Sequence, residues 1–321
     1  MNRPLPTLEA LRTGGKRALA QMLSRLEADR GSAEIAAFLD KAAQIEGGHV
    51  LGLTGPPGVG KSTLTDALIA AYRERGERVA VLAIDPSSRF TGGALLGDRT
   101  RLQTDPDDPD IFVRSMAARD RLGGLSDDAI AAIALLRAVN DRVIVESVGI
   151  GQSESDLVQA ADTVVLCIQP GSGDSLQFMK AGVMELPDIV VITKADMGAA
   201  ARRAASDVAG ALSLSRRKAE GWEVPVCEIS ARSGQNLDRL TAAVSDHQTH
   251  LRGGGRLVTK RAAQCGLWVA DMVKARYGQA GLEVLHRGIG TGRYEGAGQR
   301  PFATYRQVSN DIDARLVAPL D

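Results

Sequence analysis

The sequence has few aromatic residues and no excess of charge of either sign. Phe, Trp and Tyr make up 3% of its 321 residues, which argues against a platform on which nucleic-acid bases stack. Lys and Arg together number 39, as do Asp and Glu, and no dense basic block is present. Because nucleic-acid binding needs a clear basic excess, no nucleic-acid partner is expected.

The sequence also lacks long apolar runs and a framework of cysteines. No run approaches the ~20 apolar residues of a membrane span, and the first residues have no apolar stretch of a signal peptide. The three cysteines, Cys167, Cys227 and Cys265, are odd in number and far apart, which favours buried, unpaired thiols. We therefore expect a cytoplasmic protein without a membrane partner.

What is present is enough apolar material for a full core, at 44% of the residues, arranged in a regular alternation. Near-continuous apolar strands alternate with helical stretches between about residues 49 and 250. This pattern predicts an α/β domain with a doubly wound, mostly parallel sheet covered on both faces. Strands are expected at 49–54, 78–84, 142–148, 163–168, 189–193 and 224–229.

Helical patterns flank this domain, which we place at 49–250, on both sides. Residues 1–48 are expected to form a helical N-terminal extension, with its helices within 8–46. Residues 251–321 are expected to form a C-terminal helical extension and a possible dimerisation arm. This second extension begins with a glycine-rich hinge at 252–255 and continues as helix over 256–278. The glycine-rich stretch 286–300 has no assignable pattern.

One motif carries the first functional prediction. Residues 55–62 read Gly-Pro-Pro-Gly-Val-Gly-Lys-Ser, which matches G-x-x-x-x-G-K-[ST] in full, after a strand and before a helix. Backbone N–H groups of such a loop surround phosphates, the lysine reaches the β and γ oxygens, and the serine can bind Mg²⁺. The alternative is a chance match in a glycine-rich turn. The expected phosphate-binding residues are Gly55, Pro56, Pro57, Gly58, Val59, Gly60, Lys61, Ser62 and Thr63.

Carboxylates that follow strands are candidates for the metal site, because ligands of open α/β sheets bind at the carboxyl ends of strands. Asp85 follows the second expected strand and Glu146 the third, and Asp98 lies in a loop. Gly149, three residues after Glu146, can offer its N–H to a γ-phosphate. The alternatives are strand-end carboxylates that cap a neighbouring helix and, for Asp98, a surface loop residue.

Two further motifs indicate which base is bound. Thr193-Lys194-Ala195-Asp196 follows the fifth expected strand and resembles the (N/T)-K-x-D signature of GTPases. The Asp196 carboxylate can accept hydrogen bonds from guanine N1–H and N2–H₂, which adenine cannot supply. The stem of Lys194 can lie along the base. Many GTPases carry Asn where this chain has Thr193. A second motif resembles the loop that contacts guanine O6, and comprises Ser230, Ala231 and Arg232.

Together with four further segments, at 84–88, 97–101, 146–154 and 171–174, these motifs resemble the methylmalonyl-CoA mutase-associated GTPases. This group includes the bacterial chaperone MeaB, proteins once called ArgK and the human cobalamin A-type protein. The resemblance runs from about residue 10 to 250 and is weak beyond Gly255. It implies a homodimeric GTPase that controls loading and protection of an adenosylcobalamin-dependent acyl-CoA mutase, methylmalonyl-CoA mutase above all. The chain has no cobalamin-binding motif of its own.

The same resemblance implies roles for individual residues. The Mg²⁺ and water-positioning set would be Ser62, Asp85, Asp98 and Glu146. Residues 171–183 would be a mobile loop that responds to nucleotide and partner. We expect Lys180 to approach the nucleotide only in the partner-bound state, with Asp174 in the same loop; the alternative is that 176–179 begin a core helix and Lys180 is solvated. The catalytic candidates are Lys61, Asp85, Asp98, Gln152 and Lys180.

Three other functions remain open from the sequence. A metal-insertion accessory GTPase would have clustered Cys and His, which are scattered here. An ATP-dependent kinase of a transport protein is disfavoured by the motif at 193–196. A module that uses GTP only as a structural ligand is disfavoured by Lys61, Asp85 and Glu146 occurring together.

Overall fold

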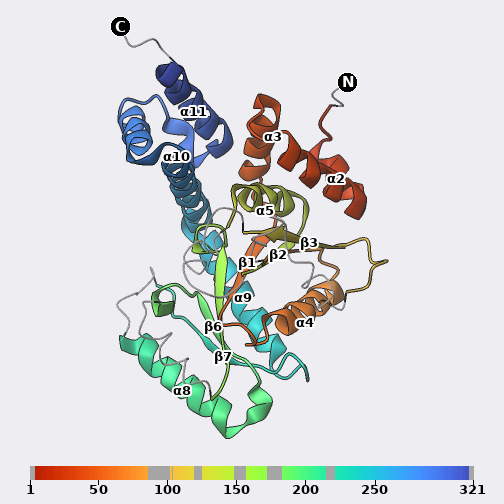
Figure 1. Ribbon diagram of the computed structural model, residues 1–321. Helices are drawn as coiled ribbons and strands as arrows, with labels where there is room; N and C mark the ends of the chain where they lie inside the picture. The colour runs from red at the N-terminus through yellow and green to blue at the C-terminus, as the bar shows by residue number, and fades with distance from the viewer. Residues whose placement is uncertain are drawn as a thin grey trace.

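The computed structural model describes residues 4–85, 102, 104–118, 125–147, 157–171, 183–214 and 221–317. At its centre lies a 7-stranded sheet with the order β3-β2-β4-β1-β5-β6-β7, in which every strand pairs parallel to its neighbours (Figure 1). The strands are β1 (His49–Thr54), β2 (Val79–Asp85), β3 (Ile111–Ala117), β4 (Arg142–Glu146), β5 (Thr163–Ile168), β6 (Ile189–Ile192) and β7 (Val226–Glu228).

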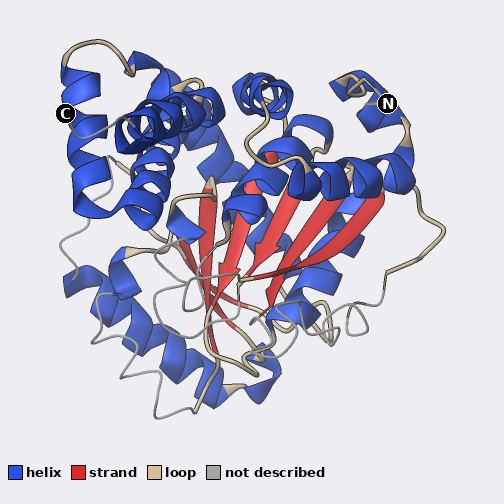
Figure 2. Ribbon diagram, turned by 45° about the horizontal axis from the view of Figure 1, so that its top comes forward, coloured by secondary structure: helices blue, strands red, loops and turns tan. Residues whose placement is uncertain are grey.

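Helices cover both faces of the sheet, so the predicted doubly wound architecture is confirmed (Figure 2). Alternate strand residues face opposite ways: Val50 and Val143 join the core beneath α5, whereas Leu51 and Ile144 join the core beneath α4 and α9. A smaller core lies under α8. These helices are α4 (Lys61–Glu74), α5 (Asp127–Val139), α8 (Ala199–Leu214) and α9 (Leu237–Arg252).

The strand β3 was not expected from the sequence. It lies at the edge of the sheet and pairs only with β2, so the segment is half-buried at its middle residues. Arg114 in this strand forms an ion pair with Glu27 on α2, at 2.6 Å between Nη2 and Oε1. An edge strand with polar residues among its apolar ones lacks the continuous apolar run that identified the central strands.

The N-terminal extension forms the three helices α1 (Leu8–Thr13), α2 (Gly15–Ala28) and α3 (Ala33–Gln44), as expected within 8–46. Side-chain caps fix two helix starts in this layer. Ser32 Oγ accepts from Ile35 N at the start of α3, and Ser126 Oγ accepts from Ala129 N at the start of α5. The extension packs through buried leucines and isoleucines against α5, on one face of the sheet.

The C-terminal extension is a pair of helices, α10 (Arg256–Gly290) and α11 (Pro301–Val317), joined by a short 3₁₀ turn, Glu295–Gly298. A 3₁₀ turn at Gly253–Gly255 separates α9 from α10, where a hinge was expected. The helix α10 bends at Gly278, which has a φ of 66°, and continues beyond the expected end at residue 278. None of the described helices has the length and apolar character that crossing a membrane requires.

A buried carboxylate forms one of the contacts between the two extensions. Asp40 on α3 accepts hydrogen bonds from the backbone N–H groups of Phe302 and Ala303, both at 3.0 Å, in the first turn of α11. An acceptor at this position satisfies donors that a helix start leaves free, and its charge favours the positive end of the helix. Burial raises the pKa of Asp40, although the two backbone hydrogen bonds oppose that shift. Asp40 therefore joins the first and last helical segments of the chain.

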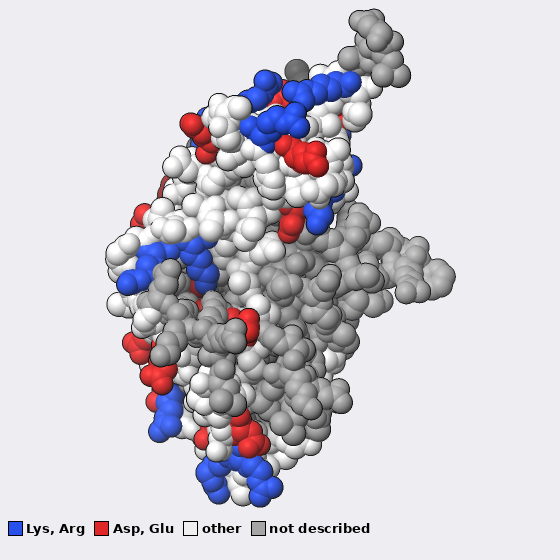
Figure 3. All heavy atoms as spheres, turned by 90° about the vertical axis from the view of Figure 1, so that its left-hand side faces the viewer, with Lys and Arg blue, Asp and Glu red and all other residues white. Residues whose placement is uncertain are grey.

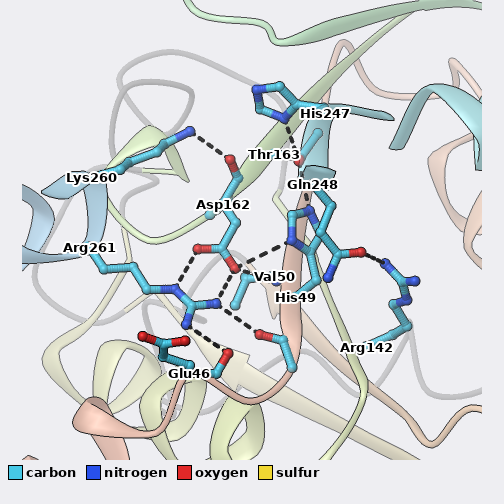
Figure 4. A network of polar contacts seen from close by, with 12 residues as sticks. Glu46, His49, Val50, Arg142, Asp162, Thr163, His247, Gln248, Lys260 and Arg261 are labelled. Atoms are coloured by element: carbon cyan, nitrogen blue, oxygen red, sulfur yellow. Dashed lines mark hydrogen bonds and ion pairs between the residues drawn. The ribbon is translucent and has the colours of Figure 1, made fainter. Parts of the chain in front are cut away.

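A second polar contact attaches α10 to the sheet at the amino ends of its strands. Arg261 donates to both carboxylate oxygens of Asp162, at 2.8 and 2.7 Å, and also to the carbonyl oxygen of Gly48 (Figure 4). The carboxylate also accepts from Val50 N in β1. Burial alone would raise the pKa of Asp162, but the hydrogen bonds from Arg261 lower it to about 2. This ion pair is buried, bidentate and hydrogen-bonded on every side.

Two buried histidines lie beside this ion pair and share one hydroxyl. Thr163 Oγ1 lies 2.7 Å from His49 Nε2 and 2.7 Å from His247 Nδ1 (Figure 4). Because the hydroxyl has a single proton, at least one of the two imidazoles must donate to it. The outer ring nitrogens face carboxylates, since His49 Nδ1 is 3.8 Å from Asp162 and His247 Nε2 is 3.7 Å from Asp188.

Because both histidines are buried, we predict that the protein loses stability in acid. Burial, which disfavours the imidazolium, lowers the pKa of His49 to about 3 and that of His247 to about 4. In the unfolded chain both imidazoles take up a proton near pH 6.5. Their contribution to the free energy of unfolding is therefore fully present above pH 6.5, and it is lost as the pH falls through 6.5 toward 4 and 3. Each histidine contributes a slope of up to ~1.4 kcal/mol per pH unit in this range.

Urea unfolding at pH 7.0, 6.0 and 5.0 measures this slope. We expect His247→Gln to reduce the slope and His286→Gln, on the exposed side of α10, to leave it unchanged. Equal slopes in both variants would show that His247 is not one of the titrating groups.

Candidate functional site

The phosphate-binding motif forms the turn between the carboxyl end of β1 and the start of α4. Gly55 has a φ of 138°, and a Cβ atom there would lie 2.3 Å from the carbonyl oxygen of Cys167 in β5. Glycine is therefore required both by the backbone conformation and by the approach of β5. Gly58 and Gly60 also have positive φ, at 74° and 102°. The loop thus has the local structure that its sequence predicted.

Lys61 is the first residue of α4 and its side chain is 7% exposed. Its Nζ donates to the carbonyl oxygen of Gly55 at 2.7 Å and to that of Pro56 at 3.2 Å. The ammonium is therefore folded over the loop that it belongs to. A positive charge held there, at the positive end of α4, makes the loop attractive to phosphate oxygens.

Glu146 ends β4 and reaches two hydroxyls on α4. Ser62 Oγ donates to its Oε1 at 2.8 Å, and Thr65 Oγ1 donates to its Oε2 at 3.1 Å. Glu146 is buried, and parallel pairing places it beside Leu53 in β1. Sequence reasoning paired Ser62 with Glu146 but missed Thr65. The spacing of three residues from Ser62 to Thr65 on one helix was the available signal.

The expected base-binding residues follow β6 and β7 as two neighbouring loops. Thr193 is buried, and its hydroxyl donates to the carbonyl oxygen of Val59 in the phosphate loop at 2.8 Å. Lys194 and Asp196 are exposed, and Lys194 Nζ donates to Gln169 Oε1 at 2.7 Å. Ala195 N donates to Ile229 O, which fixes this loop next to the one at 230–232.

The second base loop is only partly exposed. Ser230 is buried, and its backbone N–H donates to Gln235 O at 3.1 Å. Ala231 is half-buried and Arg232 is exposed. The hydroxyl of Thr193 donates to the phosphate loop, and the expected contact of Thr193 with the base stays a prediction. Thr193 therefore links the base loop to the phosphate loop across 134 residues of sequence.

Several expected site residues cannot be placed. For Asp85 only the main chain is described, at the carboxyl end of β2 beside Ala117 of β3. Asp98, Gly149, Gln152 and Lys180 lie outside the described residues, as does Asp174. The structure therefore brings together the phosphate loop, Glu146 and the base loops, whereas the roles given to these other residues remain predictions.

The oxygen atoms at Ser62 and Glu146 suit a small, hard cation. Mg²⁺ prefers oxygen ligands and often takes only one or two carboxylates, with water and phosphate as the remaining ligands. Within the described part of the chain no group of three or more His, Cys, Asp or Glu is arranged to hold a metal ion. The donor set at the phosphate loop thus fits Mg²⁺ bound together with a nucleotide.

The thiols take no part in this site. Cys167 in β5 and Cys227 in β7 are buried, and Cys265 on α10 is half-buried, with no disulfide. Burial raises the pKa of Cys167 to about 12 and also raises the pKa of the other two thiols. Since the thiolate is the reactive form, none of the three is set up as a nucleophile or metal ligand.

Comparison with protein families gives one match that spans most of the chain. The family model of the methylmalonyl Co-A mutase-associated GTPase MeaB matches residues 19–282. The match continues beyond Gly255, where the resemblance was expected to weaken, and so includes most of α10.

Individual proteins are similar over comparable lengths. A protein of Pyrococcus horikoshii named as a GTPase is 44% identical over 263 residues, which cover 79% of this chain and 80% of that protein. The mouse mitochondrial methylmalonic aciduria type A homolog is 38% identical over 227 residues, or 70% of this chain and 55% of the mouse protein. The crystal structure of a LAO/AO transport system kinase superposes with a TM-score of 0.68 at 27% identity, and covers 95% of this chain and 96% of that one.

Proposed function

Because the chain belongs to the methylmalonyl-CoA mutase-associated GTPases and hydrolyses GTP as members of that family do, we propose that it controls an adenosylcobalamin-dependent acyl-CoA mutase. In this role GTP binding and hydrolysis govern cofactor loading and protection of the mutase. The observation that carries the GTPase part is the intact phosphate loop, in which Lys61 donates to Gly55 O and Ser62 donates to Glu146. The mutase part is supported by the name of the family and of its mouse relative.

The geometry suggests how the chain handles the triphosphate. Backbone N–H groups of the loop and the start of α4 bind the phosphates, and Lys61 exchanges its two carbonyl acceptors for phosphate oxygens. Ser62 Oγ would hold Mg²⁺ through a lone pair while its hydroxyl still donates to Glu146 Oε1, and the ion would supply positive charge at the phosphates. Asp85, Asp98 and Gln152 are proposed to complete the metal and water-positioning set.

Hydrolysis by the isolated chain is expected to be slow. The sequence offers no evident arginine finger, since the candidates Arg99 and Arg101 belong to a predicted loop outside the described residues, and an arginine at the transferred phosphate is worth about 10³–10⁵ in rate. We therefore expect a purified acyl-CoA mutase of this cobalamin-dependent class to bind the chain and to accelerate GTP turnover.

The experiment that tests the proposal combines size-exclusion chromatography of the two proteins with steady-state GTP hydrolysis. An active mutase that neither forms a complex nor changes turnover would contradict the mutase role and leave the GTPase assignment intact. Lys180→Ala is expected to remove most of the stimulation while the complex persists, and Asp174→Ala should behave alike.

The base loop gives a separate prediction on specificity. In Asp196→Asn the amide supplies a donor where guanine N2–H₂ also donates, so GTP affinity should fall about 10- to 100-fold, the equivalent of one charged hydrogen bond. Xanthosine triphosphate should bind better than in the parent chain, since its O2 accepts from that amide. Competition against a fluorescent GDP measures both affinities, with Asp207→Asn on the exposed side of α8 as control. An equal loss for both nucleotides would make Asp196 a structural residue.

We further propose that the three unpaired thiols reflect a reducing compartment such as the cytoplasm.

We also propose that the chain works as a homodimer. Two large apolar side chains on α10, Val258 and Leu267, are more than half exposed. Light scattering of the purified chain, alone and with Leu267→Ser, tests the dimer. A monomer at micromolar concentration would contradict it.

A further inference from the structure

A cavity of about 360 Å³ lies where the two extensions meet, far along the chain from any nucleotide motif. Five helices contribute to its wall: α2 and α3 from the N-terminal side, α5 from the central domain, and α10 and α11 from the C-terminal side. Its volume is in the range of small-molecule sites. Much of the wall is apolar and buried, as at Leu26, Ile35, Leu39, Met272 and Phe302.

Two buried polar atoms in this wall have no hydrogen-bond partner among the described residues. Ser309 is 4% exposed and Trp268 is 6% exposed, and in that part of the chain neither Ser309 Oγ nor Trp268 Nε1 forms a hydrogen bond. A buried donor that is left unsatisfied destabilises the folded state. Indole N–H is only a donor and a hydroxyl can donate, so both groups suit a ligand that brings oxygen acceptors.

The charged residues in the cavity wall are three arginines, Arg30, Arg276 and Arg306, and two aspartates, Asp127 and Asp128. Arg30 is paired with Asp128, and Arg276 with Asp313. Arg306 donates through Nε to the carbonyl oxygen of Gly31 and forms no ion pair with any carboxylate in the described part of the chain. Lys and Arg side chains lie among Asp and Glu side chains at the end of the molecule where the C-terminal helices lie (Figure 3). The group in the cavity wall that suits a negatively charged ligand is therefore the guanidinium of Arg306.

One face of α11 combines these properties in sequence. Phe302, Tyr305, Arg306 and Ser309 all line the cavity and follow the spacing of one helix face. Arg306 and Ser309 are one turn apart and can reach the same group, whereas Phe302 lies deeper, 4.6 Å from the Trp268 ring between centroids. The helix thus presents a cation and a hydroxyl at one end and an apolar surface at the other.

We propose that this cavity binds an amphipathic carboxylate, with its apolar body among the helices and its carboxylate at Arg306 and Ser309. Such a ligand contacts both extensions at once, so its binding stabilises their packing. The site is independent of the nucleotide and of any mutase, and rests only on the cavity, the two unpartnered polar atoms and Arg306.

Tryptophan fluorescence gives a direct test, because the chain has only two tryptophans. In Trp222→Phe the remaining indole is Trp268, in the cavity wall. Sodium decanoate, below its micelle concentration, should change this emission saturably with one molecule per chain, and decanol should bind at least tenfold more weakly. Calorimetric titration of the unmodified chain with decanoate should give the same dissociation constant.

Two further variants locate the ligand. Arg306→Gln should weaken decanoate at least tenfold, whereas Arg315→Gln, on the same helix but outside the cavity wall, should not. Ala131→Leu, which fills the cavity from α5, should abolish binding without unfolding the chain. The proposal is overturned if decanoate does not saturate, if decanol binds equally well, or if Arg306→Gln and Ala131→Leu bind decanoate as the parent does.

Discussion

Lys61→Ala is expected to lower kcat for GTP hydrolysis about 10²–10³-fold, the usual effect of removing one preorganised charge-stabilising group. Lys61 is buried at the start of α4 and its Nζ is held by Gly55 O and Pro56 O. Two weak anchors on backbone carbonyls position the ammonium and can be exchanged for phosphate oxygens, which form stronger, charge-assisted hydrogen bonds. Lys61 stabilises the negative charge that develops in the transition state. The fold decrease in kcat should therefore exceed the fold decrease in GDP affinity.

Single-turnover hydrolysis with saturating nucleotide measures this effect, and thermal unfolding verifies that the variant is folded. Lys41→Ala, an exposed lysine on α3, is the matched control and should hydrolyse GTP like the parent. A decrease of less than fivefold in folded Lys61→Ala would mean that another group carries the charge stabilisation.

Asp162→Ala is expected to reduce the free energy of unfolding by about 3–5 kcal/mol, since it leaves the guanidinium of Arg261 buried and uncompensated. Val50 N and the loop at Gly48 would lose part of the same network. Arg261→Ala should reduce the free energy of unfolding by a similar amount, because it leaves the carboxylate of Asp162 buried and uncompensated. The double variant Asp162→Leu with Arg261→Met should cost much less than the sum, because apolar groups of similar size need no charge partner.

Urea unfolding of the single and double variants measures the coupling free energy between Asp162 and Arg261. The network lies at the amino ends of the strands, whereas the phosphate loop follows the carboxyl end of β1, so nucleotide affinity should be unchanged in folded variants. Additive costs would show that the ion pair contributes little beyond its separate hydrogen bonds.

Features encoded locally could be predicted from the sequence. The phosphate loop and the central strands each depend on a few adjacent residues, and both are present in the structure. The stretch at 286–300 was left unassigned because glycine normally interrupts helices. In the structure α10 runs to Gly290, and Gly288 makes room for the Tyr294 ring, which a Cβ atom would approach to 2.1 Å. That glycine serves packing, which no local pattern reveals.

Contacts between distant segments could not be predicted. Thr193 and Val59 belong to separate motifs, and no local pattern indicates that the Thr193 hydroxyl donates to Val59 O. Arg261 and Asp162 are 99 residues apart and belong to no motif. In each case the partner is chosen by the folded arrangement of strands and helices, whereas a single sequence displays only residue types and spacings.

The contact between Asp40 and α11 also constrains how the chain is made. Asp40 is translated more than 260 residues before its backbone partners, Phe302 and Ala303. Domains usually fold from the N-terminus as the ribosome delivers them. Here helices α1–α3 emerge before α11 and cannot complete their packing against it until α11 has left the ribosome. We therefore expect nascent chains that stall before residue 301 to expose the side of α3 that α11 covers.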